Sequence, residues 1–181
     1  MSRGILYGAI GKRWLDEAIT SATSSLRHNN VPHIVYTDCA PPREVPGIEF
    51  RPYRSCGEPK ADRMDIMART PFTETIYLDT DTYVADDISA LFGLLARFDL
   101  AVAHAAAYVG LTDSEVPHAF YEVNAGVIAF RKSPPVMQLL ANWRATYLGW
   151  LQDPRFRMWA VLGDQPSFRR CLWASEASVY I

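Results

Sequence analysis

Short apolar runs alternate with helical patterns along most of this chain of 181 residues. The apolar runs cover residues 5–10, 33–36, 48–50, 75–78, 100–103, 125–130 and 179–181. The helical patterns, in which apolar residues recur every three or four positions, cover residues 15–26, 60–69, 88–96, 134–148 and 164–172. Strands that alternate with helices favour a three-layer α/β/α domain with a mainly parallel central sheet.

The pattern runs without a linker, a repeat or a low-complexity segment, so residues 1–181 are expected to form a single domain. Its last residues, Val179-Tyr180-Ile181, start a strand and have no cap, polar tail or turn after them. This ending predicts an interrupted, C-terminally shortened domain.

Charge and composition disfavour several classes of protein. The net charge of −2 leaves no electrostatic footprint for nucleic acid. The cysteines Cys39, Cys56 and Cys171 are far apart and form no CxxC pair, which disfavours a disulfide framework and a structural zinc site. No apolar stretch approaches the ~18 to 20 residues of a membrane span, and the N-terminal run is too short for a signal peptide. We therefore expect a soluble, cytoplasmic protein.

An acidic pair, Asp79 and Asp81, directly follows the apolar run 75–78. In open α/β sheets, ligands bind beyond the carboxyl ends of the strands. Residues two apart in an extended chain point to the same side, so both carboxylates can face one ion. Hard carboxylate oxygens favour Mg²⁺ or Mn²⁺, which keep coordination positions open for substrate phosphates. The pair therefore predicts a divalent-cation site, although a surface turn would also use these residues.

Three segments resemble the GT-A type nucleotide-diphospho-sugar transferases, and within them the retaining, family 8-like group. They are KADRMDIMARTPFTETIYLDTDTYVADDISALF, EVNAGVIAFRKS and LGDQPSFRRCLW, which follow one another in that order over residues 60–173. The first sixty residues fit this group only in their pattern of strands and helices. The resemblance implies a glycosyltransferase that moves a sugar from a nucleotide-sugar, a UDP-sugar, to an unknown acceptor.

The resemblance also implies the roles of individual residues. Asp79 and Asp81 would bind manganese, or magnesium, and with it the donor's ribose and diphosphate. Asp164 and Gln165 are expected to be catalytic, with Asp164 on the sugar hydroxyls and Gln165 beneath the anomeric carbon. The full donor-binding set is Tyr7, Gly8, Ala9, Asp38, Lys60, Arg63, Asp79, Thr80, Asp81, Asn124, Ala125, Gly126, Asp164 and Gln165.

Several of these residues also have an ordinary structural explanation. Asp164 suits a helix N-cap, Asn124 suits a turn before a strand, and Arg63 and Lys60 suit a solvated helix face. The expected family also supplies a third metal ligand, a histidine after the last strand, and no histidine follows His118 in this chain. Weak donor and metal affinity is therefore expected, and a nucleotide-sugar-binding module without turnover stays open as an alternative.

A nucleotidyltransferase on a similar fold is the third reading. It would require a glycine-rich, basic N-terminal loop for a triphosphate. Only the segment Gly8-x-x-Gly11-Lys12-Arg13 resembles such a loop, and it does so distantly.

Overall fold

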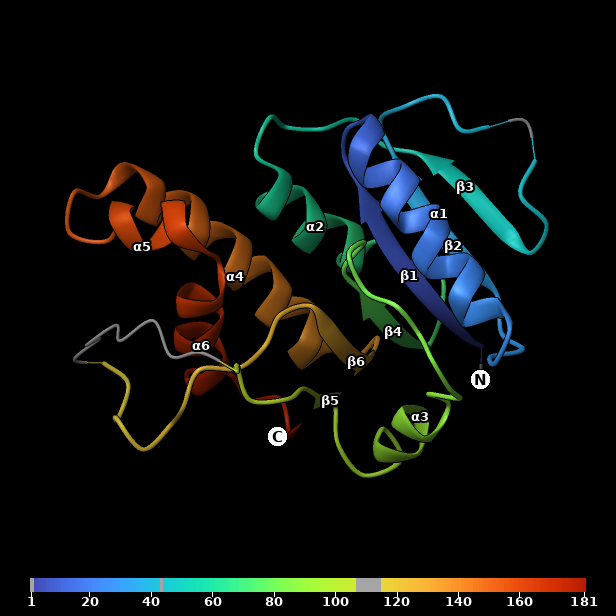
Figure 1. The fold of residues 1–181 in the computed structure, drawn as a ribbon. Helices are drawn as coiled ribbons and strands as arrows, with labels where there is room; N and C mark the ends of the chain where they lie inside the picture. Colours follow the sequence, from blue (N-terminus) through green and yellow to red (C-terminus); the bar gives the residue numbers. More distant parts are fainter. Residues whose placement is uncertain (1, 43, 107–114) are drawn as a thin grey trace.

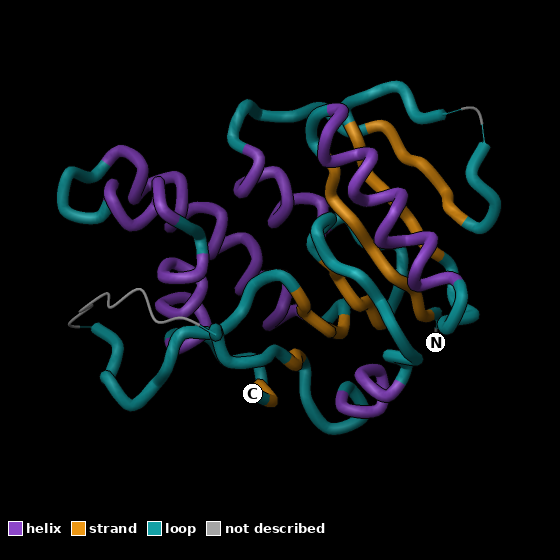
Figure 2. Tube along the Cα trace, viewed as in Figure 1, coloured by secondary structure: helices purple, strands orange, loops and turns teal. Residues whose placement is uncertain are grey.

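The computed structural model describes residues 2–42, 44–106 and 115–181, which form a central sheet with helices on both of its faces (Figure 1). Figure 2 shows the same alternation of strands and helices along the chain. The strands are β1 (Arg3–Ala9), β2 (His33–Thr37), β3 (Ile48–Pro52), β4 (Glu74–Leu78), β5 (Leu100–Ala101), β6 (Val127–Arg131) and β7 (Val179–Tyr180). The helices are α1 (Lys12–Leu26), α2 (Pro59–Ala68), α3 (Ala90–Leu94), α4 (Pro134–Gln152), α5 (Arg157–Leu162) and α6 (Gln165–Trp173).

The sheet has the strand order β3-β2-β1-β4-β6-β5-β7. Strands β1 to β4 are parallel, whereas β6 runs antiparallel to both of its neighbours, β4 and β5. Leu78 at the carboxyl end of β4 is paired with Val127 at the amino end of β6. The reversed strand therefore brings the segment before Val127 next to the acidic pair that follows Leu78. The expected three-layer, mainly parallel α/β fold is confirmed.

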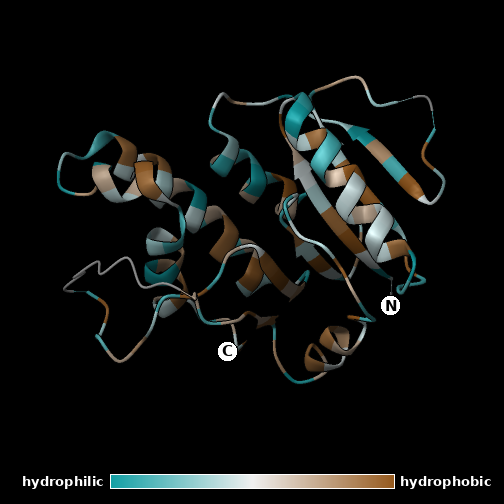
Figure 3. Ribbon diagram, in the orientation of Figure 1, coloured by the Kyte–Doolittle hydropathy of each residue, from teal (hydrophilic) through white to brown (hydrophobic). Residues whose placement is uncertain are grey.

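Alternation along β1 divides the core into two layers. One layer contains Tyr7, together with Ile5 and Ala9 two positions to either side of it, packed with residues of α1 such as Leu15. Leu6 points to the opposite face and packs in the layer that includes residues of α2 and α4. Successive side chains of a strand point to opposite faces, so a continuous apolar run is buried on both sides. In Figure 3, apolar residues accordingly recur along β1, β4 and α4.

Helix α5 was not predicted from the sequence. It has six residues, and Met158, Val161 and Leu162 are exposed on it although they are apolar. An amphipathic pattern reveals a helix only when burial separates its faces, and most of the apolar residues of this short helix are exposed.

Within the described part of the chain, no helix is long and apolar enough to cross a membrane. Cys39, Cys56 and Cys171 are all free thiols.

Candidate functional site

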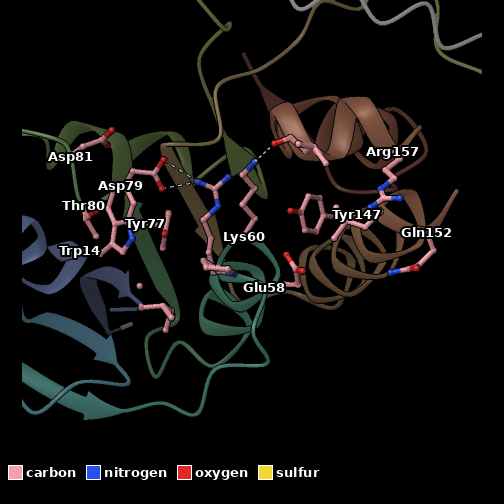
Figure 4. A pocket seen from close by; sticks show the side chains of 16 residues that line it. Trp14, Glu58, Lys60, Tyr77, Asp79, Thr80, Asp81, Tyr147, Gln152 and Arg157 are labelled. Carbon is pink, nitrogen blue, oxygen red and sulfur yellow. Dashed lines mark hydrogen bonds and ion pairs between the residues drawn. The ribbon is translucent and has the colours of Figure 1, made fainter. Parts of the chain in front are cut away.

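Two adjoining cavities open at the carboxyl ends of β1 and β4. The larger has a volume of about 740 Å³ and the smaller about 320 Å³. Lys60, Arg63 and Asp79 line both cavities, so the two meet at these side chains. Figure 4 shows the larger cavity, with Lys60 near its centre.

Asp79 is held from several directions. Its backbone N–H donates to the Gly126 carbonyl at 2.8 Å, and its own carbonyl accepts a bond of 2.8 Å from the Thr82 hydroxyl. Its carboxylate accepts from Arg63 Nη1, with distances of 2.7 Å to Oδ1 and 3.0 Å to Oδ2. The carboxylate is thus fixed in place but still 31% exposed toward the cavity.

Arg63, on α2, connects two carboxylates that are 85 positions apart in the sequence, Asp79 and Asp164. While Nη1 binds Asp79, Nη2 donates to Asp164, and the Arg63 side chain is only 12% exposed. Its guanidinium also lies 5.5 Å from the ring centre of Trp143. Burial by itself would lower the pKa of Arg63, but Asp164 and Asp79 outweigh burial and raise it above its ordinary value. Arg63 is therefore a permanent cation between two acids.

The turn before β6 forms one wall of the smaller cavity. The side-chain oxygen of Asn124 accepts from the N–H groups of Gly126, at 2.7 Å, and Val127, at 3.3 Å. A Cβ on Gly126 would lie 3.0 Å from Asp79 Oδ2 and 3.2 Å from Asn124 Oδ1. A side chain at this position would therefore crowd the acidic residue as well as the turn.

Asp164 and Gln165 form the facing wall of the smaller cavity. The Asp164 carboxylate, 8% exposed, pairs with Arg63 across the cavity instead of capping its own helix α6. Gln165 Oε1 accepts from the Ala125 N–H at 3.2 Å, and its Nε2 donates to Glu122 Oε1 at the same distance. These bonds join the start of α6 to the turn before β6 at the site.

Four of the predicted donor-binding residues, Arg63, Asn124, Asp164 and Gln165, line the smaller cavity together with Asp79. Their ordinary structural explanations do not account for this, because a turn amide and a helix-start carboxylate have no packing reason to meet. Ala125, Gly126 and Lys60 line the same cavity.

Asp79, Thr80 and Asp81 all line the larger cavity, as the metal prediction requires. The Asp79 carboxylate is bonded to Arg63, and in Figure 4 Asp81 lies beyond Asp79, at the end of the cavity opposite Arg157. Among the described residues, no group of three or more His, Cys, Asp or Glu side chains is placed to hold a metal ion. A cation on this pair would therefore need substrate oxygens and water for its remaining ligands.

The structure places only part of the predicted N-terminal donor-binding segment at a cavity. Tyr7 and Ala9 are fully buried, and of the predicted segment only Gly8 lines a cavity. Tyr7 alternates away from Gly8 and packs in the core instead, where its hydroxyl accepts from Ser21 at 3.2 Å. The exposed Asp38 is absent from the linings of both cavities, and its carboxylate accepts a bond of 2.7 Å from the Gly11 N–H. Asp38 therefore braces the β1–α1 connection.

Sequence reasoning missed much of the lining of the larger cavity. The additional residues are Ile10, Trp14, Glu58, Pro59, Tyr77, Tyr147, Leu151, Gln152, Arg157 and Val161. Most of them belong to α1, α4 and α5, where they read as ordinary helix residues. Lys60, a candidate for the donor's phosphates, lines both cavities and donates from Nζ to the Val161 carbonyl at 3.2 Å.

Solved structures of sugar-transferring enzymes share this architecture. The glycosyltransferase GlyE of Streptococcus pneumoniae TIGR4 superposes with a TM-score of 0.64 and 18% identity, over 99% of this chain. An active-site mutant of LgtC superposes with a TM-score of 0.66 and 14% identity, over 98% of the chain. The galactosyltransferase LgtC, in complex with donor and acceptor sugar analogues, gives a TM-score of 0.61 and 15% identity over the same share. The chain has the fold of these glycosyltransferases.

This chain spans 45% of the length of GlyE, 71% of the LgtC mutant and 72% of the LgtC complex. Its sequence matches no protein-family model and no curated protein. The glycosyltransferase fold is thus carried here by a sequence that has diverged far from those of the solved structures.

Proposed function

We propose that this chain is the donor-binding part of a retaining, family 8-like glycosyltransferase that takes a sugar from a UDP-sugar. The observation that carries the proposal is the convergence of Arg63, Asp79, Asn124, Asp164 and Gln165 on one cavity. Hydroxyl-rich ligands are bound by such a mixture of carboxylate, amide and guanidinium groups, which offers donors and acceptors at fixed positions. The shared glycosyltransferase fold supports the same reaction class.

We further propose that Asp79 and Asp81 hold Mn²⁺ or Mg²⁺ when the donor is bound. The residues fit such an ion. The Asp79 carboxylate faces the cavity, and each of its oxygens keeps a lone pair beyond the one used by Arg63. Asp81 is exposed in the same cavity and adds a second hard oxygen ligand. The bound ion would supply charge neutralisation of the leaving diphosphate.

The residues around the sugar then act by positioning and charge. Arg63 would complement the developing negative charge of the diphosphate, because its guanidinium remains protonated. Asp164 is already neutralised by Arg63, so it suits hydrogen bonding to sugar hydroxyls better than nucleophilic attack. An internal-return displacement, in which the leaving phosphate accepts the proton of the acceptor, fits this arrangement. Gln165 would face the anomeric carbon, and one LgtC structure carries an active-site glutamine-to-glutamate change.

Calorimetric titration with UDP tests the proposal. Because the acidic pair would repel a diphosphate without a cation, Mn²⁺ should raise the affinity for UDP at least tenfold over the same titration in EDTA. Asp81→Asn should abolish that gain. Equal UDP affinity with Mn²⁺ and with EDTA in the wild-type protein would refute the metal-dependent donor site.

A binding module without turnover is the second candidate. It is favoured by the two-carboxylate metal site, which lacks a third protein ligand among the described residues. Release of UDP from a UDP-sugar in the presence of Mn²⁺, lost in Asp81→Asn, would show an enzyme. UDP-sugar binding without such release would show a binding module.

The nucleotidyltransferase alternative loses its support. The side chains of Lys12 and Arg13 pair with Asp16 and Glu17 along α1, so they brace the helix surface and do not form a basic phosphate loop.

A further inference from the structure

The larger cavity extends past Arg63 to a wall that the donor contacts leave unused. This α4–α5 wall consists of Tyr147, Gln152, Arg157 and Val161, with Glu58 from the start of α2 beside it. In Figure 4 the labelled members Tyr147, Gln152, Arg157 and Glu58 lie on the side of Lys60 away from Trp14 and Asp81.

Tyr147 presents a polar atom to this part of the cavity. Tyr147 is only 3% exposed, and its hydroxyl points into the cavity in Figure 4. Within residues 2–42, 44–106 and 115–181, this hydroxyl has no hydrogen-bond partner. Burial, with the nearby charges of Glu58 and Asp164, raises the pKa of Tyr147 to about 12. The hydroxyl therefore stays protonated at neutral pH and can donate a hydrogen bond to a ligand.

The two halves of the cavity differ in charge. At the donor half, Arg63 is already paired with Asp79 and Asp164, and Asp81 adds a further carboxylate, so an anion needs an added metal ion. At the α4–α5 wall, Arg157 and the neighbouring Lys60 of α2 line the same part of the cavity as the carboxylate Glu58.

The two cations at this wall, Arg157 and Lys60, differ in the partners that they already have. Over the described ranges, the exposed Arg157 guanidinium has neither an ion pair nor a side-chain hydrogen bond. The Lys60 ammonium donates to the neutral Val161 carbonyl and retains its other protons. An anion can therefore bind here without a metal.

We infer that the α4–α5 wall binds an acceptor carrying an anionic group, a phosphate or a carboxylate, through Arg157, Lys60 and Tyr147. That the ligand is an acceptor rests on the proposed glycosyltransferase function, whereas the anion site itself rests on the residues at the wall. A guanidinium forms paired hydrogen bonds to carboxylate or phosphate oxygens, an ammonium adds a point charge, and the phenol adds a neutral donor. Glu58 and Gln152 are then available for the hydroxyls of the sugar that carries the anion.

Three probes that differ in their anionic group test the inference: glucose, glucose 6-phosphate and glucuronate. Each is titrated into the wild-type chain with and without saturating UDP and Mn²⁺, and again in EDTA. We expect at least one anionic probe to bind tenfold or more tightly than glucose, with the same affinity in EDTA and with UDP present. The ratio between the two anionic probes distinguishes a phosphate from a carboxylate acceptor.

Variants assign the binding to this wall. Arg157→Gln should reduce the preference for the anionic probe about tenfold, and Tyr147→Phe, which keeps the packed ring, about threefold. Arg155→Gln is the matched control, because Arg155 is an exposed arginine two positions away that pairs with Asp153 at 2.7 Å. This control should leave the preference unchanged.

Each outcome decides between the proposals. Equal binding of all three probes, or an unchanged preference in Arg157→Gln, would overturn the anion site. Displacement of the anionic probe by UDP would overturn it too, because the cations would then serve the donor's diphosphate. Absence of Mn²⁺-dependent UDP binding overturns the donor site instead, and the metal-free titrations still decide the anion site.

Discussion

Replacing Arg63 by methionine should destabilise the fold strongly, because Arg63 holds Asp79 and Asp164 together. Methionine keeps most of the volume beside Trp143 but leaves the two carboxylates without a counter-charge. Removing one partner of a buried ion pair costs ~3–5 kcal/mol. Since water still reaches Asp79, which is 31% exposed, we expect the lower end, about 3 kcal/mol.

The expected loss translates into a large shift in thermal unfolding. For a chain of this length, about 1 kcal/mol corresponds to roughly 2–4 °C, so Tm should fall by roughly 6–12 °C at pH 7. Differential scanning calorimetry of Arg63→Met and wild type at pH 7 measures the effect.

Arg157→Met provides the matched control for Arg63→Met. Arg157 is an exposed cation without an ion pair in the described part of the chain, so its loss should change the free energy of unfolding by less than about 0.5 kcal/mol. A Tm of Arg63→Met within about 2 °C of wild type would refute the role assigned to the buried arginine.

Three further predictions concern the donor site and the core. Gly126→Ala should weaken Mn²⁺-dependent UDP binding about tenfold in calorimetry, because its Cβ would crowd the Asp79 carboxylate at 3.0 Å. Asp164→Ala should weaken binding of a UDP-sugar more than binding of UDP, whereas Asp81→Ala should weaken both. Burial lowers the pKa of His33, so the unfolded chain binds more protons and Tm should fall as the pH drops from 7.5 through about 6.5; His33→Gln should flatten this dependence.

Controls make these predictions decisive. Gly93→Ala, at a helical glycine where a Cβ meets open space, should leave UDP binding unchanged and stabilise α3 by up to about 1 kcal/mol. Equal UDP binding by Gly126→Ala and wild type would show that the turn before β6 does not constrain the acidic pair. Identical ligand profiles for Asp164→Ala and Asp81→Ala would contradict the division between sugar and diphosphate contacts. A pH dependence of Tm that persists in His33→Gln would show that groups other than His33 cause it.

The sequence alone predicted the α/β class and most of the elements, because burial leaves a periodic pattern. Residues 5–10 and 75–78 are continuous apolar runs since both faces of the sheet are covered, and α1 carries an apolar stripe since one side is buried. Helix α5 escaped prediction because it is short and most of its apolar residues are exposed. Where an element was buried on one side or on both, the spacing of its apolar residues was enough to predict it.

The residues of the proposed donor site were partly predictable, because the order of the motifs pointed to them without any knowledge of their contacts. Asp79 and Asp81 follow a strand end, and Asn124 and Asp164 stand at the starts of β6 and α6. Local patterning could not decide that Tyr7 points into the core while Gly8 reaches the cavity, because that depends on which face of the sheet α1 covers. Asp38 likewise braces a loop for reasons of chain geometry.

Only the tertiary structure joined the distant parts of the site. The reversal of β6 sets Val127 opposite Leu78, which places Gly126 against Asp79, and the packing of α6 brings Asp164 to Arg63. The α4–α5 wall arises in the same way, from a helix pair whose residues have no shared signal along the chain. Strand direction and helix packing are non-local choices made by the whole core, whereas periodicity and motif spacing are local properties that the sequence carries by itself.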